Sequence, residues 1–269
     1  MAEAAESSYG SILAVDVGNT CTGIGLFREG ELVASWNVAT RERTTSDEAR
    51  LTVRGLLCTV PDGCMEAPCV DDSILSCVVP DLTPAWVAAL SVECGRKPFL
   101  VGPGTKTGMK MRYRDPAEIG SDRIADVVAA RERYGFPLVV VDFGTTTNLE
   151  VIDAEGAFAG GIIAPGVELS ALAVARAAAR LPVVEIRAPR TVIGRSTAEA
   201  MQAGIVMGEV ARIDGLIRMI WDELGYETGV AATGEGAAAL CALSARIEQA
   251  DETLTLRGLE RLYRMNRLK

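Results

Sequence analysis

The segment Ile12-Leu13-Ala14-Val15-Asp16-Val17-Gly18-Asn19-Thr20 is an apolar run that ends in an aspartate and a polar, glycine-containing turn. The same order returns in Leu138-Val139-Val140-Val141-Asp142-Phe143-Gly144-Thr145-Thr146. Asp142 lies 126 residues after Asp16, and the Glu-Gly pairs ending at Gly30 and Gly156 are separated by the same distance, so the two copies keep register without a gap. This period is too long for a solenoid. It predicts two duplicated domains, each beginning with strand, turn, strand, turn and strand.

Both turns carry residue types that bind phosphate. A glycine lets backbone N–H groups converge on an anion without interference from a Cβ atom, and Thr20, Thr145 and Thr146 add hydroxyl donors. An aspartate at the end of a buried strand offers an oxygen to Mg²⁺, which prefers carboxylates, water and substrate phosphates. A single aspartate in such a turn more often stabilises the turn itself. The occurrence of two such turns in matched register favours phosphate binding instead. Turns that face each other across a cleft could bind a polyphosphate from both sides.

The composition excludes several classes of protein. The 269 residues are 49% hydrophobic and 23% charged, which is typical of a globular protein. The formal net charge of −9 argues against non-specific binding to nucleic acid or to an acidic membrane. The first residues lack the basic start and apolar core of a signal peptide, and no apolar run approaches the length of a membrane span. We therefore expect a cytoplasmic protein.

The absence of histidine removes Ser-His-Asp and Cys-His catalysis and histidine-ligated metal sites. Any general base must be Asp, Glu, Lys, Cys or Tyr. The seven cysteines are an odd number without a C-x-x-C motif, so we expect reduced thiols rather than a disulfide framework. Zinc binding by the cysteines between Cys58 and Cys77 is an alternative, although their spacing matches no common site.

The pattern of apolar residues predicts an α/β fold with mixed sheets. The first half is expected to run β-β-β-α-β-α-β, with strands near residues 12–15, 22–27, 32–38, 74–79 and 98–101 and helices over 46–57 and 83–94. A glycine- and proline-rich connection follows over residues 101–118. The second half is expected to contain helices after residue 121 and over 167–180, 197–223 and 255–263, with strands from 138 and over 229–233. We place the domains at 1–118 and 119–269.

Asp122 is our candidate for the catalytic base. It lies at a predicted helix start, where N–H groups and the helix dipole favour the ionised form. An ionised carboxylate can accept the proton of a substrate hydroxyl during phosphoryl transfer, and the neighbouring Arg123 could bind an acidic substrate group. From spacing alone, Ser121 and Asp122 could equally be ordinary capping residues and Arg123 a surface charge.

Taken together, the motifs resemble those of the type III pantothenate kinases. The matching segments are Asp16-Val17-Gly18-Asn19-Thr20, Gly120-Ser121-Asp122-Arg123-Ile124, Asp142-Phe143-Gly144-Thr145, Gly161-Ile162-Ile163-Ala164-Pro165-Gly166 and Ile193-Gly194-Arg195-Ser196-Thr197. The resemblance implies two ribonuclease-H-like domains of the actin-like ATPase superfamily with a cleft between them. It also implies ATP-dependent phosphorylation of pantothenate to 4'-phosphopantothenate, the first step of coenzyme A biosynthesis.

The resemblance also assigns roles to individual residues. The nucleotide phosphate turn would be formed by Asp16, Val17, Gly18, Asn19, Thr20, Cys21, Thr22 and Gly23, with Thr145 as a further ATP contact. The pantothenate site would comprise Tyr113, Gly120, Ser121, Asp122, Arg123 and Thr197, with Asp122 as the proton acceptor. Asp142 would bind the monovalent cation, K⁺ or NH₄⁺, that the family requires besides Mg²⁺. Members of the family are homodimers.

The chain departs from the family pattern at three places. Ser121 replaces an alanine, the segment Thr145-Thr146-Thr147-Asn148-Leu149-Glu150 differs from the usual Thr-Ala-Thr-Thr-Phe-Asp, and Glu235 stands where a glycine is expected. Glu235 would place a carboxylate near the phosphate or ribose of the nucleotide.

Two other functions remain open at this stage. One is a kinase of the same superfamily that acts on another small hydroxyl substrate. The other is a non-catalytic or weakly catalytic relative that acts as a regulatory accessory protein. The presence of Asp16, Asp122 and Asp142 together favours catalysis, because a degenerate regulator would not need all three.

Overall fold

The structure, a computed structural model, describes residues 10–60, 69–177, 181–182 and 184–267. The chain forms two compact units. The first consists of residues 1–108, 115–129 and 255–269, and the second of residues 109–114 and 130–254.

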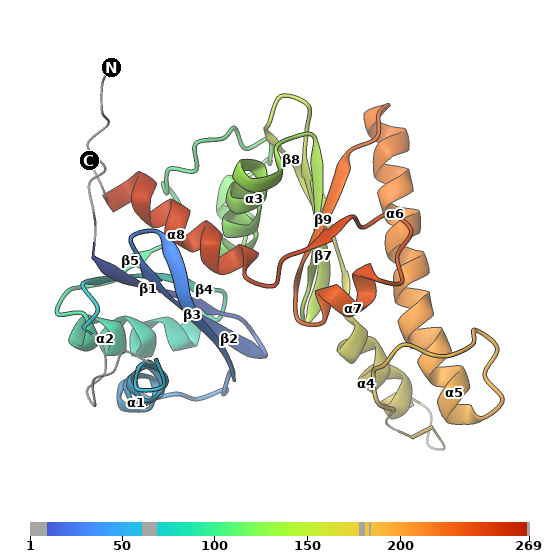
Figure 1. Cartoon of the computed structure of the whole chain (residues 1–269), viewed down its shortest axis with the longest axis horizontal. Helices are drawn as coiled ribbons and strands as arrows, with labels where there is room; N and C mark the ends of the chain where they lie inside the picture. Colours follow the sequence, from blue (N-terminus) through green and yellow to red (C-terminus); the bar gives the residue numbers. More distant parts are fainter. Residues whose placement is uncertain (1–9, 61–68, 178–180, 183, 268–269) are drawn as a thin grey trace. The chain divides into compact units, whose positions relative to one another are not determined.

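The first unit is built on a mixed sheet with strand order β3-β2-β1-β4-β5. Its strands are β1 (Ser11–Val17), β2 (Cys21–Arg28), β3 (Glu31–Ala39), β4 (Asp72–Cys77) and β5 (Phe99–Leu100). The helices α1 (Ser46–Leu57) and α2 (Thr83–Glu93) cover one face, with the short 3-10 helix η1 (Pro80–Leu82) before α2 (Figure 1). Alternate residues of β1, such as Leu13 and Val15, point into the core beneath these helices.

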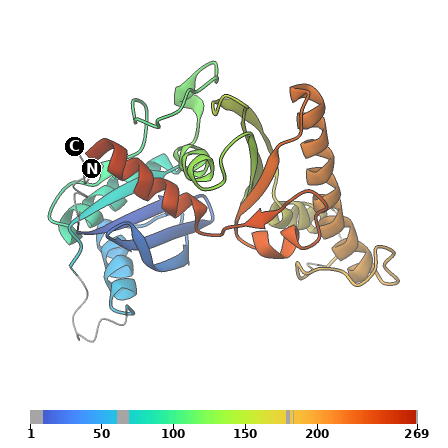
Figure 2. The same ribbon diagram turned by 45° about the horizontal axis from the view of Figure 1, so that its top comes forward.

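The helix α8 (Leu254–Arg267) lies along the other face of this sheet (Figures 1 and 2), although it is the last element in the sequence. Gly25 of β2 leaves room for it, because a Cβ atom there would lie 3.2 Å from Leu256 Cδ1. The Tyr263 hydroxyl donates a 2.8 Å hydrogen bond to Asp72 Oδ2 at the start of β4. Burial and this carboxylate raise the pKa of Tyr263, so the phenol remains a donor.

The second unit repeats the arrangement. Its strand order is β8-β7-β6-β9-β10, formed by β6 (Leu138–Phe143), β7 (Thr146–Ile152), β8 (Phe158–Pro165), β9 (Gly229–Gly234) and β10 (Gln249–Ala250). In both sheets the first strand is antiparallel to the second and parallel to the fourth. The equal order confirms the duplication predicted from the two aspartate motifs.

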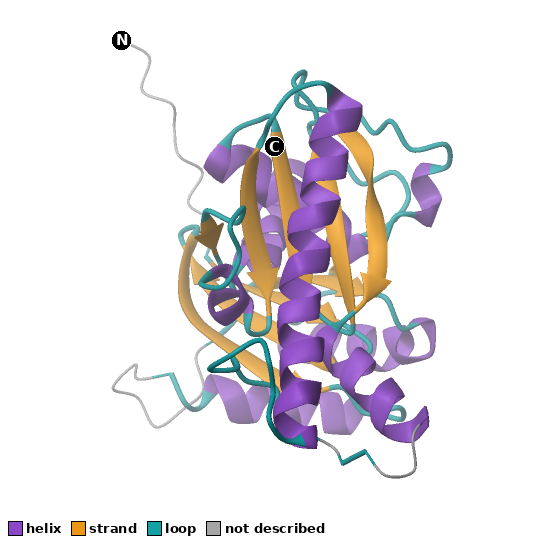
Figure 3. Ribbon diagram, turned by 90° about the vertical axis from the view of Figure 1, so that its right-hand side faces the viewer, coloured by secondary structure: helices purple, strands orange, loops and turns teal. Residues whose placement is uncertain are grey.

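Helices also pack on the second sheet. The long helix α6 (Gly208–Leu224) lies over one face of it (Figure 3) and buries Val210, Ile213 and Ile217 against the strands. The unit also contains α4 (Val167–Ala177), α5 (Thr197–Gln202) and α7 (Ala237–Cys241). The helix α3 (Ser121–Tyr134), preceded by the 3-10 helix η2 (Pro116–Glu118), begins in the first unit and ends in the second.

The two copies differ at the turn after the aspartate. In the first, Val17 pairs with Thr22 and residues 18–21 form the turn, whereas in the second Phe143 pairs with Thr147 and only residues 144–146 intervene. Thr147 is therefore the structural counterpart of Thr22, although the ungapped sequence match aligns Thr22 with Asn148. A change of one residue reverses which face of the sheet a side chain reaches.

The predicted elements agree closely with the structure, although the short elements α7 and β10 were not predicted and two further helices differ. The expected helix 197–223 is divided by a π-helical segment, Ala203–Met207, between α5 and α6. The last helix extends to Arg267 rather than ending near residue 263. The two compact units are not continuous in sequence, because α8 packs on the first sheet, and the domain boundary expected between residues 118 and 119 stays a prediction.

The described residues also bear on cysteine and membrane expectations. The described cysteines are free thiols, namely Cys21, Cys58, Cys69, Cys77, Cys94 and Cys241, whereas Cys64 lies outside the described residues. Within the described ranges, no three Cys, His, Asp or Glu side chains are grouped to hold a metal ion. None of the helices described is long and apolar enough to cross a membrane.

The crossing of α8 and α3 gives a prediction about stability. A Cβ atom on Gly258 of α8 would collide with the backbone oxygen of Ala125 in α3, so Gly258→Ala should destabilise the protein by about 2 kcal/mol or more through overpacking. Gly215→Ala, in the exposed middle of α6 with nothing within 4 Å, should instead stabilise it by roughly 0.5–1 kcal/mol. Urea unfolding measures both. Equal effects of the two variants would contradict this account of the crossing.

Candidate active site

The turn after β1, which the sequence predicts to bind phosphate, is shaped by Gly18. Its N–H donates a 3.0 Å hydrogen bond to the carbonyl oxygen of Cys21, and a Cβ atom on Gly18 would lie 2.8 Å from the same oxygen. A larger residue would open the turn. Asn19, Thr20 and Cys21 are exposed at its tip, which makes them accessible to a ligand.

The remaining predicted residues of this segment are less accessible. Val17 and Thr22 are buried, and the Thr22 hydroxyl shares a 2.8 Å hydrogen bond with the Thr40 hydroxyl. A Cβ atom on Gly23 would lie 3.7 Å from Leu256 of α8. These residues support the turn, while residues 19–21 are open to contact with a nucleotide.

Asp16 carries the carboxylate of this turn. It is aligned with Gly23 on β2 and with Ser76 on β4. Its Oδ1 atom is buried and accepts no hydrogen bond from the described residues. Burial, followed by the negative charge of Asp122, raises the pKa of Asp16 to about 7, while a hydrogen bond from Ser76 opposes the shift. The carboxylate is thus prepared for a positively charged partner.

Asp122 lies in the first turn of α3, close enough to Asp16 for their charges to interact. The Arg123 N–H donates a 2.7 Å hydrogen bond to Asp122 Oδ1, and a Cβ atom on Gly120 would collide with that oxygen. Burial raises the pKa of Asp122 and outweighs the lowering by the Arg123 N–H and guanidinium. From the sequence, the helix start is expected to favour the ionised form of Asp122. The net shift is in the opposite direction, because burial favours the protonated form.

Ser76 is a site residue that sequence reasoning missed. Its hydroxyl and that of Ser121 are 2.7 Å apart, which joins β4 to the first turn of α3. The signal was a polar residue inside the apolar run from Ile74 to Val79. In a parallel pair, β1 and β4 end at the same edge of the sheet, so Ser76 is brought beside Asp16.

The second phosphate turn follows β6. The Gly144 N–H donates a 3.0 Å hydrogen bond to the Thr146 carbonyl oxygen. Asp142 is aligned with Thr233 on β9, and a Cβ atom on Gly234 would lie 2.6 Å from Asp142 Oδ1. The Thr233 hydroxyl is fully buried and has no hydrogen-bond partner among the described residues. Two side-chain oxygens of neighbouring strands therefore lie at this end of the sheet.

Tyr113 and Thr197 belong to the second unit. The Tyr113 ring stacks on buried Phe158 of β8, with 5.8 Å between ring centroids and 7° between ring planes. The Arg112 N–H donates a 2.8 Å hydrogen bond to the Phe158 carbonyl oxygen, which fixes the segment 109–114 to this strand. Gly120, Ser121, Asp122 and Arg123 lie in the first unit, so the predicted substrate residues are divided between the two units.

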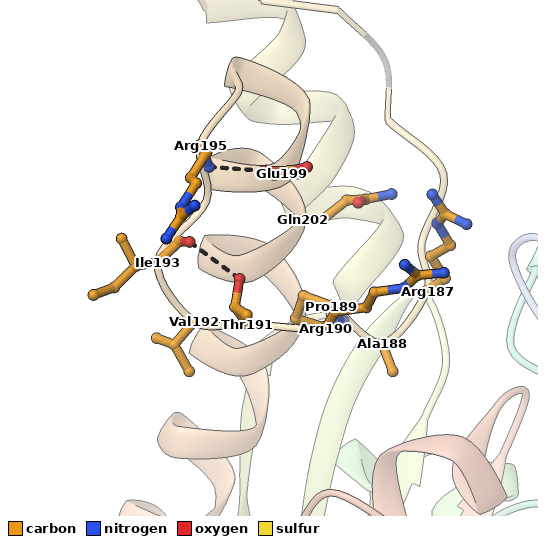
Figure 4. A pocket seen from close by; sticks show the side chains of 10 residues that line it. All are labelled: Arg187, Ala188, Pro189, Arg190, Thr191, Val192, Ile193, Arg195, Glu199 and Gln202. Atoms are coloured by element: carbon orange, nitrogen blue, oxygen red, sulfur yellow. Dashed lines mark hydrogen bonds between the residues drawn. The ribbon is translucent and has the colours of Figure 1, made fainter.

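Thr197 is the first residue of α5 and is exposed. The Ser196 hydroxyl accepts a 3.3 Å hydrogen bond from the Glu199 N–H, and Glu199 in turn accepts one of 2.7 Å from the Arg195 N–H. The preceding loop borders a hollow of about 1000 Å³ (Figure 4). The hollow is lined by Arg187, Ala188, Pro189, Arg190, Thr191, Val192, Ile193, Arg195, Glu199 and Gln202.

Comparison with known proteins identifies the family. The family model described as type III pantothenate kinase matches residues 12–219. The chain belongs to this family. A type III pantothenate kinase of Anaeromyxobacter dehalogenans strain 2CP-C is 41% identical over 95% of this chain and 100% of its own length. One of Halalkalibacterium halodurans is 38% identical over 95% of this chain and 99% of its own.

Solved structures of lower identity share the fold. A putative 2-dehydro-3-deoxygalactonokinase from Sinorhizobium meliloti has a TM-score of 0.58 at 16% identity, covering 97% of this chain and 98% of its own. A putative Baf family transcriptional activator from Campylobacter jejuni has a TM-score of 0.57 at 17% identity, covering 94% and 98%. The two duplicated α/β units are thus those of the actin-like ATPase fold.

Glu235, which stands where the family pattern has a glycine, lies in a tight turn. Gly234 and Gly236 on either side have φ angles of +88° and +74°, which favour glycine. The Glu235 residue itself is exposed. Glu235 is therefore a surface residue of this turn.

The raised pKa of Asp16 gives a prediction about stability and pH. The folded state binds the Asp16 proton up to about pH 7, whereas the ordinary pKa of an aspartate is 3.8, so between these values the folded state holds more protons than the unfolded state. The unfolding free energy should then fall by about 1.4 kcal/mol for each pH unit between pH 3.8 and about pH 7, and it should stay level above that range. Asp16→Asn should become more stable than the unsubstituted protein as the pH rises from 5 to 8, in the absence of nucleotide and divalent cations.

Urea unfolding at several pH values measures this difference. Asp222→Asn, on the exposed part of α6, is the control for loss of a surface carboxylate. A stability difference between Asp16→Asn and the unsubstituted protein that does not change between pH 5 and 8 would show that Asp16 is not desolvated.

Proposed function

We propose that the protein transfers the γ-phosphoryl group of ATP to the hydroxyl of pantothenate, the first step of coenzyme A biosynthesis. Membership of the type III pantothenate kinase family supports this activity. The observation that carries the mechanism is that Asp16 and Asp122 interact in one buried cluster of the first unit. A phosphate-binding turn and a proton acceptor are then available together.

Asp122 accepts the proton of the attacking hydroxyl in this mechanism. Its raised pKa makes it a stronger base than an exposed carboxylate. The Arg123 N–H donates a hydrogen bond to one oxygen of the Asp122 carboxylate. Gly120 makes room for this oxygen, because a Cβ atom at residue 120 would collide with it. Positioning of this kind contributes most of the catalysis in phosphoryl transfer.

The other predicted residues bind the two substrates. The turn from Asp16 to Gly23 and Thr145 contact ATP, with the exposed residues 19–21 making the direct contacts. Pantothenate contacts Tyr113, Thr197 and the segment Gly120–Arg123, in which the Arg123 guanidinium pairs with an acidic group.

The donor atoms of both turns fit cations. Asp16 Oδ1, a buried oxygen without a partner among the described residues, suits Mg²⁺, and Asp142 with the buried Thr233 hydroxyl suits a monovalent cation such as K⁺ or NH₄⁺. When bound, these ions neutralise the negative charge of the phosphates.

We further propose that the protein is a cytoplasmic homodimer. The second unit exposes several large apolar side chains, a pattern that marks interaction surfaces. They are Leu169, Leu172, Val174, Ile186, Val192 and Ile193.

The kinase activity is tested by ADP release with ATP, Mg²⁺ and pantothenate. We expect turnover that requires pantothenate and is stimulated by K⁺, and a loss of about 10²–10⁴-fold in kcat for Asp122→Asn, the contribution typical of a general base. Asp81→Asn, at an exposed position of the same unit, is the matched control. Absence of turnover in a folded protein would reject the proposal, and full activity of Asp122→Asn would reject the assigned base alone.

A further inference from the structure

A buried glutamate lies behind the second phosphate turn. Glu209, the second residue of α6, is 4% exposed. The Thr147 hydroxyl donates a 2.6 Å hydrogen bond to its Oε1, and Arg212 Nη2 donates to its Oε2. A carboxylate that is removed from water requires such partners. The hydrogen bond between Glu209 and Thr147 therefore connects α6 to the start of β7, where the turn ends.

Arg212 makes a second connection. Its Nη2 also donates a 2.6 Å hydrogen bond to the Pro165 carbonyl oxygen at the end of β8. The Glu209 carboxylate is 3% exposed and the Arg212 side chain 31%, so the contact is shielded from water on the glutamate side. One guanidinium thus joins α6 to the junction between β8 and α4.

This junction touches the phosphate turn directly. The Gly166 N–H donates a 3.1 Å hydrogen bond to the Thr145 carbonyl oxygen. A Cβ atom on Gly166 would collide with the Gly144 carbonyl oxygen and lie 2.7 Å from that of Thr145. The turn is therefore held at Thr147 on one side and at Gly166 on the other, and both contacts lead to the Glu209–Arg212 pair.

The first unit supports the equivalent position without charges. Thr22, the counterpart of Thr147 in strand pairing, shares its hydrogen bond with the neutral Thr40 hydroxyl. The ion pair is therefore a feature of the second copy. Substitution of one member of a buried charge pair leaves the other charge uncompensated, so this support is more sensitive to substitution than a pair of hydroxyls.

We propose that Glu209 and Arg212 are positioning residues that hold the Gly144-Thr145-Thr146 turn in the conformation that contacts ATP. The inference rests on the proposed function, since it takes Thr145 as an ATP contact. Neither residue has to touch the nucleotide, because both act through Thr147 and through the Pro165-Gly166 junction.

Arg212→Lys tests the proposal, because both contacts are made by the terminal Nη2 atom, and lysine keeps the charge on a side chain that is one bond shorter. We expect the Kd for ATP, measured by calorimetry, to rise about tenfold while the Kd for pantothenate stays within twofold. The Gly166 amide should exchange with deuterium faster than in the unsubstituted protein. Arg218→Lys, at an exposed ion pair of the same helix, should change none of these quantities.

A double variant guards against a folding defect. Glu209→Gln with Arg212→Met removes both charges, so it should fold better than Arg212→Met alone. Its Kd for ATP should still be raised, because the turn has lost its connection to α6.

The outcomes separate this inference from the proposed function. Unchanged ATP affinity and Gly166 exchange in a folded Arg212→Lys protein would overturn the inference, as would an equal weakening of both substrates. Absence of ATP turnover by the unsubstituted protein would reject the kinase activity instead. In that case, faster Gly166 exchange in Arg212→Lys would still support the connection between Arg212 and the turn.

Discussion

The first unit depends on placing two carboxylates, Asp16 and Asp122, in one buried cluster. Like charges in a poorly hydrated site raise each other's cost of ionisation, so the cluster favours a shared proton or a bound cation. The surrounding residues reduce this cost locally. Ser76 donates toward Asp16, the Arg123 N–H donates to Asp122, and Gly120 makes space for the Asp122 carboxylate.

The second unit has the same strand order, but the turn after its aspartate is supported by different side chains. Its turn is one residue shorter, so Thr147 takes the place of Thr22 in the strand pairing. The first turn then rests on a neutral hydroxyl pair, whereas the second rests on a charged helix side chain. Duplication has preserved the positions of Asp16 and Asp142, while the supports around them have diverged.

Much of the fold could be predicted from local signals in the sequence. Helix α1 begins and ends where expected, because Thr45 and Glu48 form a reciprocal capping box. The strands were located by their apolar runs and the duplication by its offset. The π-helical segment Ala203–Met207 was not predicted from the sequence. The apolar residues on both sides of it follow a helical spacing, and this spacing does not reveal one extra residue in a turn.

The candidate site was predictable only where a motif is contiguous. Asp16, Asp122 and Asp142 each stand two residues from a glycine in a recognisable motif. Ser76, Glu209 and Arg212 became visible only with the strand pairing and helix packing, since their partners lie far away in sequence. The net pKa direction of Asp122 was also beyond the sequence, because it depends on burial rather than on the helix start.

The position of α8 has a consequence for how the chain is made. The first sheet is covered on one face by a helix that follows the second unit in the sequence. During synthesis, β1, β2 and β4 can pair early, but their face toward Leu256 and Tyr263 stays uncovered until the second unit has been translated. Completion of the first unit is thus coupled to synthesis of the whole second one, and the nascent chain carries an exposed apolar surface throughout that interval.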